Sequence, residues 1–473
     1  MTQPKLFRIL STFTPDEWKG FGRYVHSPFF TVHEDTVQFF ELIEPHYPDF
    51  EAPELEAEAI FEALYPGISF SDVQIRTLRK YLLRLAEGFL VQLKLRQDEP
   101  YEQQALIEAL EQRGLDALIP RLVDESRTAL EMRTLRNEPF YSHMFTLEQL
   151  AWQQRLKYGQ RTAPQDFVRM IAPLDYAYLI QKLGYSCPAL NQQIQQGIPA
   201  QIPLLDEVMQ YCRGAYADMP ALVQAYYLTA SLLRMEGNDA ELEKLLSLLA
   251  QEGDTFGKTD MINLCGYAIN YCNYRYRAGD SHRLQTMLDI YKLMLEKDLL
   301  FEQGRISLHQ FKNLSTLGIR LEAWEWTETF IHTYNDRLDA EHRDGVYQYS
   351  LAQLAAARQQ HRQALRHLQA VTFIDPFYRI SYNLLLLKIY YECMEAEPLL
   401  SLTQTLRAFL RRKKNMSDRQ QLAYAHFARL TRALFMAKIK SAKNLQAIHE
   451  DILQCEPLIE REWLLKKWAQ LAV

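Results

Sequence analysis

Apolar residues recur at spacings of three and four along most of the chain, with polar residues between them. A clear example is the stripe formed by Ile75, Leu78, Leu82, Leu85 and Phe89. This spacing places the apolar side chains on one face of an α-helix. A capping box, Ser71-x-x-Gln74, marks the residue at which that helix begins. The pattern therefore predicts a long amphipathic helix that packs through one face.

The first segment, residues 1–98, is predicted to be a compact helical bundle. Thr14-Pro15-Asp16-Glu17 is a second capping box with proline at the first helical position, and Ser27-Pro28 ends the helix that follows it. A small bundle needs bulky core residues, so seven phenylalanines are predicted to be buried rather than to form a ligand site. They are Phe29, Phe30, Phe39, Phe40, Phe50, Phe61 and Phe70.

The next segment, residues 99–215, is predicted to continue as connecting helices. Its breaks are expected at Pro100, Gly114, Pro139, Pro164 and Pro199. One helical stretch runs from Pro164 to about Gly197 and contains Pro173 and Pro188. Since proline removes a main-chain hydrogen bond, this stretch is expected to be kinked or divided.

From residue 216 to 456 the pattern becomes quasi-periodic, with pairs of helices joined by short polar turns. The turns are Glu236-Gly237-Asn238-Asp239, Ala278-Gly279-Asp280, Arg320-Leu321-Glu322 and Gln359-Gln360-His361. They recur about every 40 residues, a period typical of paired-helix repeats. Residues 457–473 are predicted to form a C-terminal capping helix, so the whole chain is assigned to the all-α class.

The segment from Gly345 to Tyr378 resembles a tetratricopeptide repeat, the helix-turn-helix unit of 34 residues. The resemblance rests on Leu351, Ala352, Ala355, Ala364, Leu368, Val371 and Pro376. Ala352 and Ala364 stand where the family has the small residues that let its two helices touch. Gln348 and Ala355 replace the family's usual Trp and Tyr, which makes this a diverged repeat. The resemblance implies an α-solenoid of stacked helix hairpins following the N-terminal bundle.

The N-terminal segment is also similar to the front end of uncharacterised tetratricopeptide-type proteins of the Bacteroidota. The residues that carry this likeness are Phe21, Tyr24, Ser27-Pro28-Phe29-Phe30 and Tyr81-Leu82. The likeness implies no activity.

In the tetratricopeptide family, the first helix of each pair lines a concave face that holds an extended peptide. Projecting that frame onto this chain predicts a peptide-binding set comprising Asn270, Asn273, Arg277, Lys312, Asn313, Tyr349, Gln353 and Asn383. Amides offer a donor and an acceptor together, which suits a peptide backbone, and Arg277 and Lys312 could receive a carboxylate. The alternative is that these are solvated helix positions in a polar groove.

Charge adds a second candidate surface. The net charge is −6 overall, yet residues 405–473 hold 14 Lys or Arg against 6 Asp or Glu. The densest cluster is Arg407, Arg411, Arg412, Lys413 and Lys414. Nucleic acid or an acidic protein segment could bind there. The alternative is a basic helix end that complements its own dipole beside a solvated face.

No motif for chemistry stands out in the sequence. It has no GxxxxGK[ST] phosphate loop, no HExxH motif, no GxSxG motif and no CxxC pair. Cys265 and Cys272 are seven residues apart and are predicted to be small core residues. No hydrophobic run reaches the length of about 20 residues that a membrane span needs. The expectation is a cytoplasmic, non-catalytic binding scaffold without cofactor, metal or membrane contact, whose partner is a protein or peptide.

Overall fold

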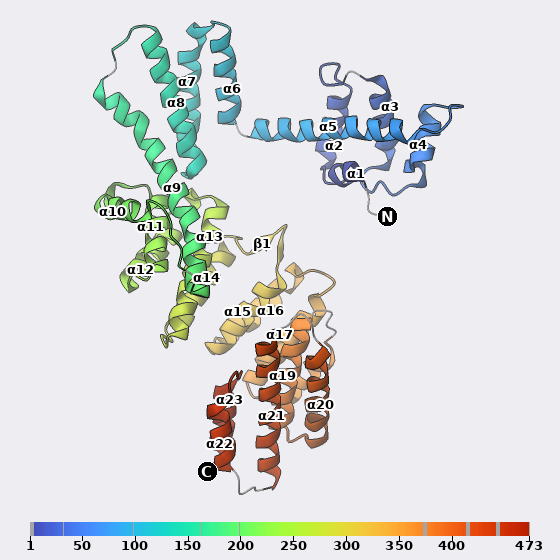
Figure 1. Ribbon diagram of the computed structural model, residues 1–473, viewed down its shortest axis with the longest axis vertical. Coiled ribbons are helices and arrows are strands. Elements are labelled where there is room, and N and C mark those ends of the chain that lie inside the picture. Colours follow the sequence, from blue (N-terminus) through green and yellow to red (C-terminus); the bar gives the residue numbers. More distant parts are fainter. Residues whose placement is uncertain are drawn as a thin grey trace. The chain divides into compact units, whose positions relative to one another are not determined.

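The computed structural model describes residues 4–31, 33–97, 99–161, 163–197, 199–371, 376–412, 417–440 and 445–472 (Figure 1). Within these ranges the chain forms 23 α-helices and one two-stranded β-ribbon. The predicted all-α class is confirmed. The helices fall into two compact units, Met1–Tyr178 and Leu179–Val473, which are described separately.

The first unit begins with a bundle of five helices. These are α1 (Lys5–Leu10), α2 (Pro15–Val25), α3 (Glu34–Ile43), α4 (Ala57–Leu64) and α5 (Asp72–Gln97). The predicted capping box of α2 is confirmed, since Glu17 N donates to Thr14 Oγ1 at 3.2 Å and Thr14 N donates to Glu17 Oε2 at 2.8 Å. Helix α5 packs against α1, α2, α3 and α4, because its apolar stripe from Ile75 to Phe89 is buried at the centre.

The prediction that all seven phenylalanines are core residues is wrong for three of them. Phe39, Phe40, Phe50 and Phe61 are buried, whereas Phe29, Phe30 and Phe70 are exposed. Phe29 and Phe30 follow the Ser27-Pro28 turn that ends α2, so they lie outside any helix whose apolar face could bury them. Phe30 stacks on Tyr24 with 3.9 Å between ring centroids, and Phe29 is 84% exposed.

Three shorter helices follow in the same unit: α6 (Glu99–Gln112), α7 (Ile119–Glu131) and α8 (Glu138–Lys157). The predicted breaks at Pro100 and Pro139 coincide with the first turns of α6 and α8. There the missing proline N–H has no helical acceptor to lose. Gly114 adopts a φ of 68° between α6 and α7, a backbone conformation that glycine reaches without strain.

The long helix α9 (Pro164–Gln196) runs without interruption through Pro173 and Pro188, so of the two predicted alternatives, a kink or a division, the division is wrong. The boundary between the two units lies inside it, after Tyr178. Its C-terminal half carries a buried stripe comprising Ile180, Leu183, Cys187 and Leu190. Burial of this stripe offsets the main-chain hydrogen bond that a proline removes.

The second unit continues with α10 (Leu205–Gly214) and then with successive helix pairs. They are α11 (Ala221–Leu233) with α12 (Asp239–Gln251), α13 (Lys258–Arg277) with α14 (Arg283–Glu296), α15 (Leu308–Arg320) with α16 (Trp324–Tyr334), α17 (Arg343–Ala357) with α18 (His361–Gln369), and α19 (Pro376–Glu392) with α20 (Ala396–Arg412). Helices α21 (Asp418–Lys440), α22 (Leu445–Gln454) and α23 (Arg461–Ala472) complete it. All four predicted turns join the two helices of a pair, as expected.

Each pair also packs on its neighbours. Helix α11 contacts α13, α15 contacts α17, α17 contacts α19 and α19 contacts α21. Ala352 and Ala364 are fully buried where α17 and α18 meet. Cys265 and Cys272 are buried as predicted, and burial raises the pKa of each thiol to about 12. These thiols therefore stay protonated at neutral pH.

A short β-ribbon connects α14 to α15 and was not predicted. Strand β1 (Phe301–Glu302) pairs antiparallel with β2 (Arg305–Ile306), with Phe301 opposite Ile306. The two residues between the strands, Gln303 and Gly304, both have positive φ angles, as a two-residue hairpin turn requires.

Candidate functional site

A polar cleft opens among helices α13, α14 and α15 of the second unit. Its volume is about 450 Å³. Four of the eight predicted peptide-binding residues line it: Asn270, Asn273, Lys312 and Asn313. Helices α13 and α15 are the first helices of successive pairs, the helices from which the sequence predicted the binding face.

Helical spacing explains why these side chains share a surface. On α13 the lining positions are 269, 270, 273 and 276, and on α15 they are 309, 312, 313, 316, 317 and 320. Residues three or four apart lie on one helix face. The other face of α13, which includes Cys265, Ala268 and Cys272, is buried in the core. Packing of the apolar face therefore directs the amides into the cleft.

Two of the predicted residues are already tied to other helices. Asn270 Nδ2 donates to Asn191 Oδ1 of α9 at 3.1 Å. Lys312 Nζ donates to Ser381 Oγ of α19 at 2.8 Å and lies 5.0 Å from the centroid of the Tyr378 ring. Lys312 is therefore held in a fixed position at the side of the cleft.

Asn273 and Asn313 differ from these two. Both are half-buried, and neither side-chain amide makes a hydrogen bond to another residue in the described part of the chain. Each can offer a donor and an acceptor to a bound group. An extended peptide backbone presents the complementary pattern of C=O and N–H groups.

The charge of the cleft is positive. Lys312 and Arg320 line it together with His309, and none of the described lining residues is Asp or Glu. Burial raises the pKa of Tyr291, which contributes a neutral hydroxyl to the wall from α14. This arrangement can hold a backbone through amides and attract a carboxylate through cations.

The structure places the other four predicted residues elsewhere. Arg277 is exposed at the last residue of α13 and does not line the cleft. Tyr349 is buried against Tyr378, and burial raises its pKa. Gln353 lines a different pocket, and Asn383 is half-buried on α19. The cleft therefore contains half of the predicted set.

Sequence reasoning missed several lining residues. Tyr276, Tyr291, His309, Thr316 and Arg320 all contribute side chains to the cleft. Thr316 and Arg320 follow Lys312 at intervals of four, so extending the helical spacing of the predicted residues would have found them.

The predicted basic patch lies mostly outside the described side chains. Arg407 is exposed on α20. The main chain of Arg411 and Arg412 ends that helix, and the structure does not describe their side chains. Lys413 and Lys414 lie outside the described residues.

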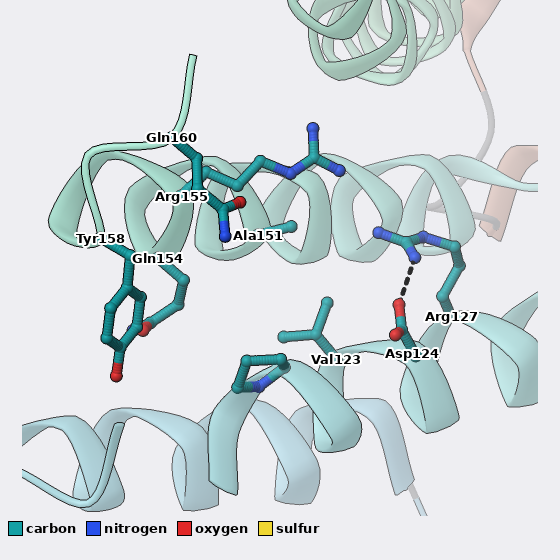
Figure 2. Close-up of a pocket in the computed structure, with 9 residues that line it drawn as sticks. Val123, Asp124, Arg127, Ala151, Gln154, Arg155, Tyr158 and Gln160 are labelled. Carbon is teal, nitrogen blue, oxygen red and sulfur yellow. Dashed lines mark hydrogen bonds and ion pairs between the residues drawn. The ribbon is translucent and has the colours of Figure 1, made fainter. Parts of the chain in front are cut away.

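A smaller pocket of about 190 Å³ lies between α7 and α8 in the first unit (Figure 2). The Arg127 guanidinium donates to Asp124 Oδ1 at 2.7 Å and to Glu148 Oε1 at 2.8 Å. Arg155 forms an ion pair with Asp166 at 3.3 Å. Because its cations are already neutralised by carboxylates of the same unit, this pocket presents no open charge to an ionic ligand.

Among the described residues, no three His, Cys, Asp or Glu side chains are arranged to hold a metal ion. No described helix combines the length and the apolar character needed to cross a bilayer.

Comparisons of the chain with protein-family models, with curated proteins and with solved structures each found no match. The class of protein and its task therefore rest on the fold and on the cleft.

Proposed function

We propose that this chain is a non-catalytic, tetratricopeptide-like scaffold that binds an extended peptide with acidic groups in the α13–α15 cleft. The observation that carries the proposal is the pair of uncommitted amides, Asn273 and Asn313, beside the cations Lys312 and Arg320, in a cleft with no Asp or Glu among its described lining residues. Such a surface suits a peptide backbone that bears carboxylate side chains or a free C-terminus.

The helix-pair arrangement supports the tetratricopeptide-like part of the proposal. Successive pairs pack through their first helices at α15–α17, α17–α19 and α19–α21. Small residues, including Ala352, Ala364 and Gly318, stand where the two helices of a pair touch. In this proposal the pairs stack into an α-solenoid, and the cleft is part of its concave face.

Substituting both uncommitted amides should weaken peptide binding strongly. The variant Asn273→Ala/Asn313→Ala removes two hydrogen-bonding groups, each worth about 0.5–1.5 kcal/mol. We expect the affinity for a peptide selected from a displayed library on the wild-type chain to fall between about fivefold and a hundredfold. Fluorescence anisotropy with the labelled peptide measures this change.

A matched control is available on the same helix. Arg277→Ala removes an exposed cation outside the cleft and should change the affinity less than about twofold. The affinity of the wild-type chain should also fall as salt rises, because the cleft is positive. Full-strength binding by the double variant, or selection of only basic peptides, would show that the cleft is not the binding surface.

A further inference from the structure

A second pocket in the same unit lies where α15, α17, α18, α19 and α23 meet. Its volume is about 250 Å³, which suits a single side-chain-sized group. Leu385, Ile389 and Trp463 supply apolar wall, and Gln353 and His361 supply polar groups. It is distinct from the α13–α15 cleft, so a ligand can bind in it whether or not a peptide binds in that cleft.

Two residues that line this pocket each carry a polar atom without a partner among the described residues. Gln353 Oε1 and His361 Nδ1 are both buried, and neither makes a hydrogen bond within the part of the chain that the structure describes. A buried polar atom without a partner destabilises the folded state, so most such atoms in proteins are paired. Two of them, brought to one pocket from α17 and α18, indicate a place where a ligand supplies the missing hydrogen bonds.

The ionised groups around the pocket are already paired. Lys388 Nζ lies 2.7 Å from Glu460 Oε2, and Lys467 Nζ lies 2.5 Å from Glu392 Oε1. Two cations and two carboxylates cancel, so the pocket offers no open charge to an ionic ligand. The group that fits is therefore neutral and polar, on an apolar stem.

We infer that this pocket binds a primary carboxamide. A carboxamide is complementary to the Gln353 amide, because each can donate one N–H to the oxygen of the other. This reciprocal pairing holds whichever way round the oxygen and nitrogen of Gln353 are placed. The apolar stem of the ligand packs against Leu385, Ile389 and the Trp463 ring, and His361 Nδ1 makes a further hydrogen bond. The source is either a glutamine side chain of a bound peptide or a free small amide.

Ligand-observed saturation-transfer NMR on the full chain tests the pocket with three probes. N-acetylglutamine methylamide represents a peptide side chain, propanamide represents a free amide, and N-acetylglutamate methylamide is the charged isostere. We expect saturable binding of at least one carboxamide, at least tenfold stronger than binding of the glutamate probe. Preference for the glutamine probe over propanamide assigns the peptide source, and the reverse order assigns the small amide.

Substitutions at two glutamines complete the test. Gln353→Leu should weaken carboxamide binding at least tenfold, whereas Gln363→Leu, at an exposed position of α18, should leave it unchanged. Because Gln353→Leu removes an unpaired buried acceptor, its thermal midpoint should equal or exceed that of the wild type. Gln353→Glu keeps the size of the side chain and provides a second test should the leucine variant not fold.

Three results would overturn the assignment: no saturable carboxamide binding, equal binding of the glutamate isostere, or undiminished binding by both Gln353 variants. Peptide affinity at the α13–α15 cleft is measured on the same variants. Loss of the carboxamide site with intact peptide binding would leave the proposed function standing.

Discussion

Replacing Phe21 with alanine is expected to lower the local free energy of unfolding of the N-terminal bundle by about 3–5 kcal/mol. Phe21 is fully buried at the centre of this bundle. Its ring lies 5.4 Å from Phe13, 5.5 Å from Phe40 and 5.6 Å from Phe89, centroid to centroid. Truncation leaves a cavity among rings from α3, α5 and the segment before α2, which cannot all move to fill it.

Hydrogen exchange read by mass spectrometry on the full chain measures this effect. Amides of α2 and α5 should exchange more than a hundredfold faster in the variant, since each 1.4 kcal/mol is tenfold. The control is Phe29→Ala in the same bundle. Phe29 is exposed, so its substitution should change exchange little. Similar effects of the two substitutions would contradict the described core.

Replacing Gly318 with alanine should destabilise the α15–α16 pair by about 1–3 kcal/mol. A Cβ at Gly318 would overlap Thr327 Oγ1 and would come within 3.0 Å of the Trp326 ring. Both neighbours belong to α16, and Thr327 is fully buried. The absence of a side chain at position 318 is therefore what allows the two helices to approach. Exchange rates of amides in α15 and α16 report the change.

Gly266 is the matched control for this prediction. It lies inside α13, and a Cβ there would meet nothing within 4 Å. Gly266→Ala should stabilise the helix by about 0.5–1 kcal/mol, the opposite sign. Adding Thr327→Ala to Gly318→Ala should restore part of the lost stability, because it removes the nearer overlap. The account of this contact fails if both glycine substitutions change stability in the same direction.

The helices and their turns follow from local signals that the sequence carries. The capping box that begins α2 depends only on Thr14 and Glu17, which are three residues apart. Each turn between paired helices lies where the helical spacing of apolar residues stops. A division at Pro173 and Pro188, one of the two predicted alternatives, does not occur, and the reason is non-local. The cost of a proline is local, but the burial that offsets it depends on which helices pack against α9.

Burial of the phenylalanines also depends on where each residue lies in the fold. Phe39 and Phe29 are equally hydrophobic, yet Phe39 is on a helix face that packs and Phe29 is in a loop. Amino-acid composition therefore cannot tell which of the two is buried. The position in the sequence can, because Phe29 follows the Ser27-Pro28 turn and Phe39 lies after the start of α3, and only a residue within a helix can lie on its apolar face.

Only four of the eight predicted peptide-binding residues line the cleft, because the rest depend on packing between helix pairs. The repeat frame identified the face of α13 and α15 from which Asn273 and Asn313 project. It could not foresee that Lys312 reaches Ser381, 69 residues away, or that Tyr349 turns into the core. Those outcomes depend on how one pair packs against the next, which the sequence pattern does not specify.

Site-specific photocrosslinking tests the central claim, binding in the α13–α15 cleft, most directly. A benzophenone amino acid is placed at position 316, inside the cleft, or at position 289, on an exposed face of α14. The account predicts that the selected peptide crosslinks at position 316 and not at position 289. Crosslinking at 289 alone, or equal crosslinking at both positions, would contradict it.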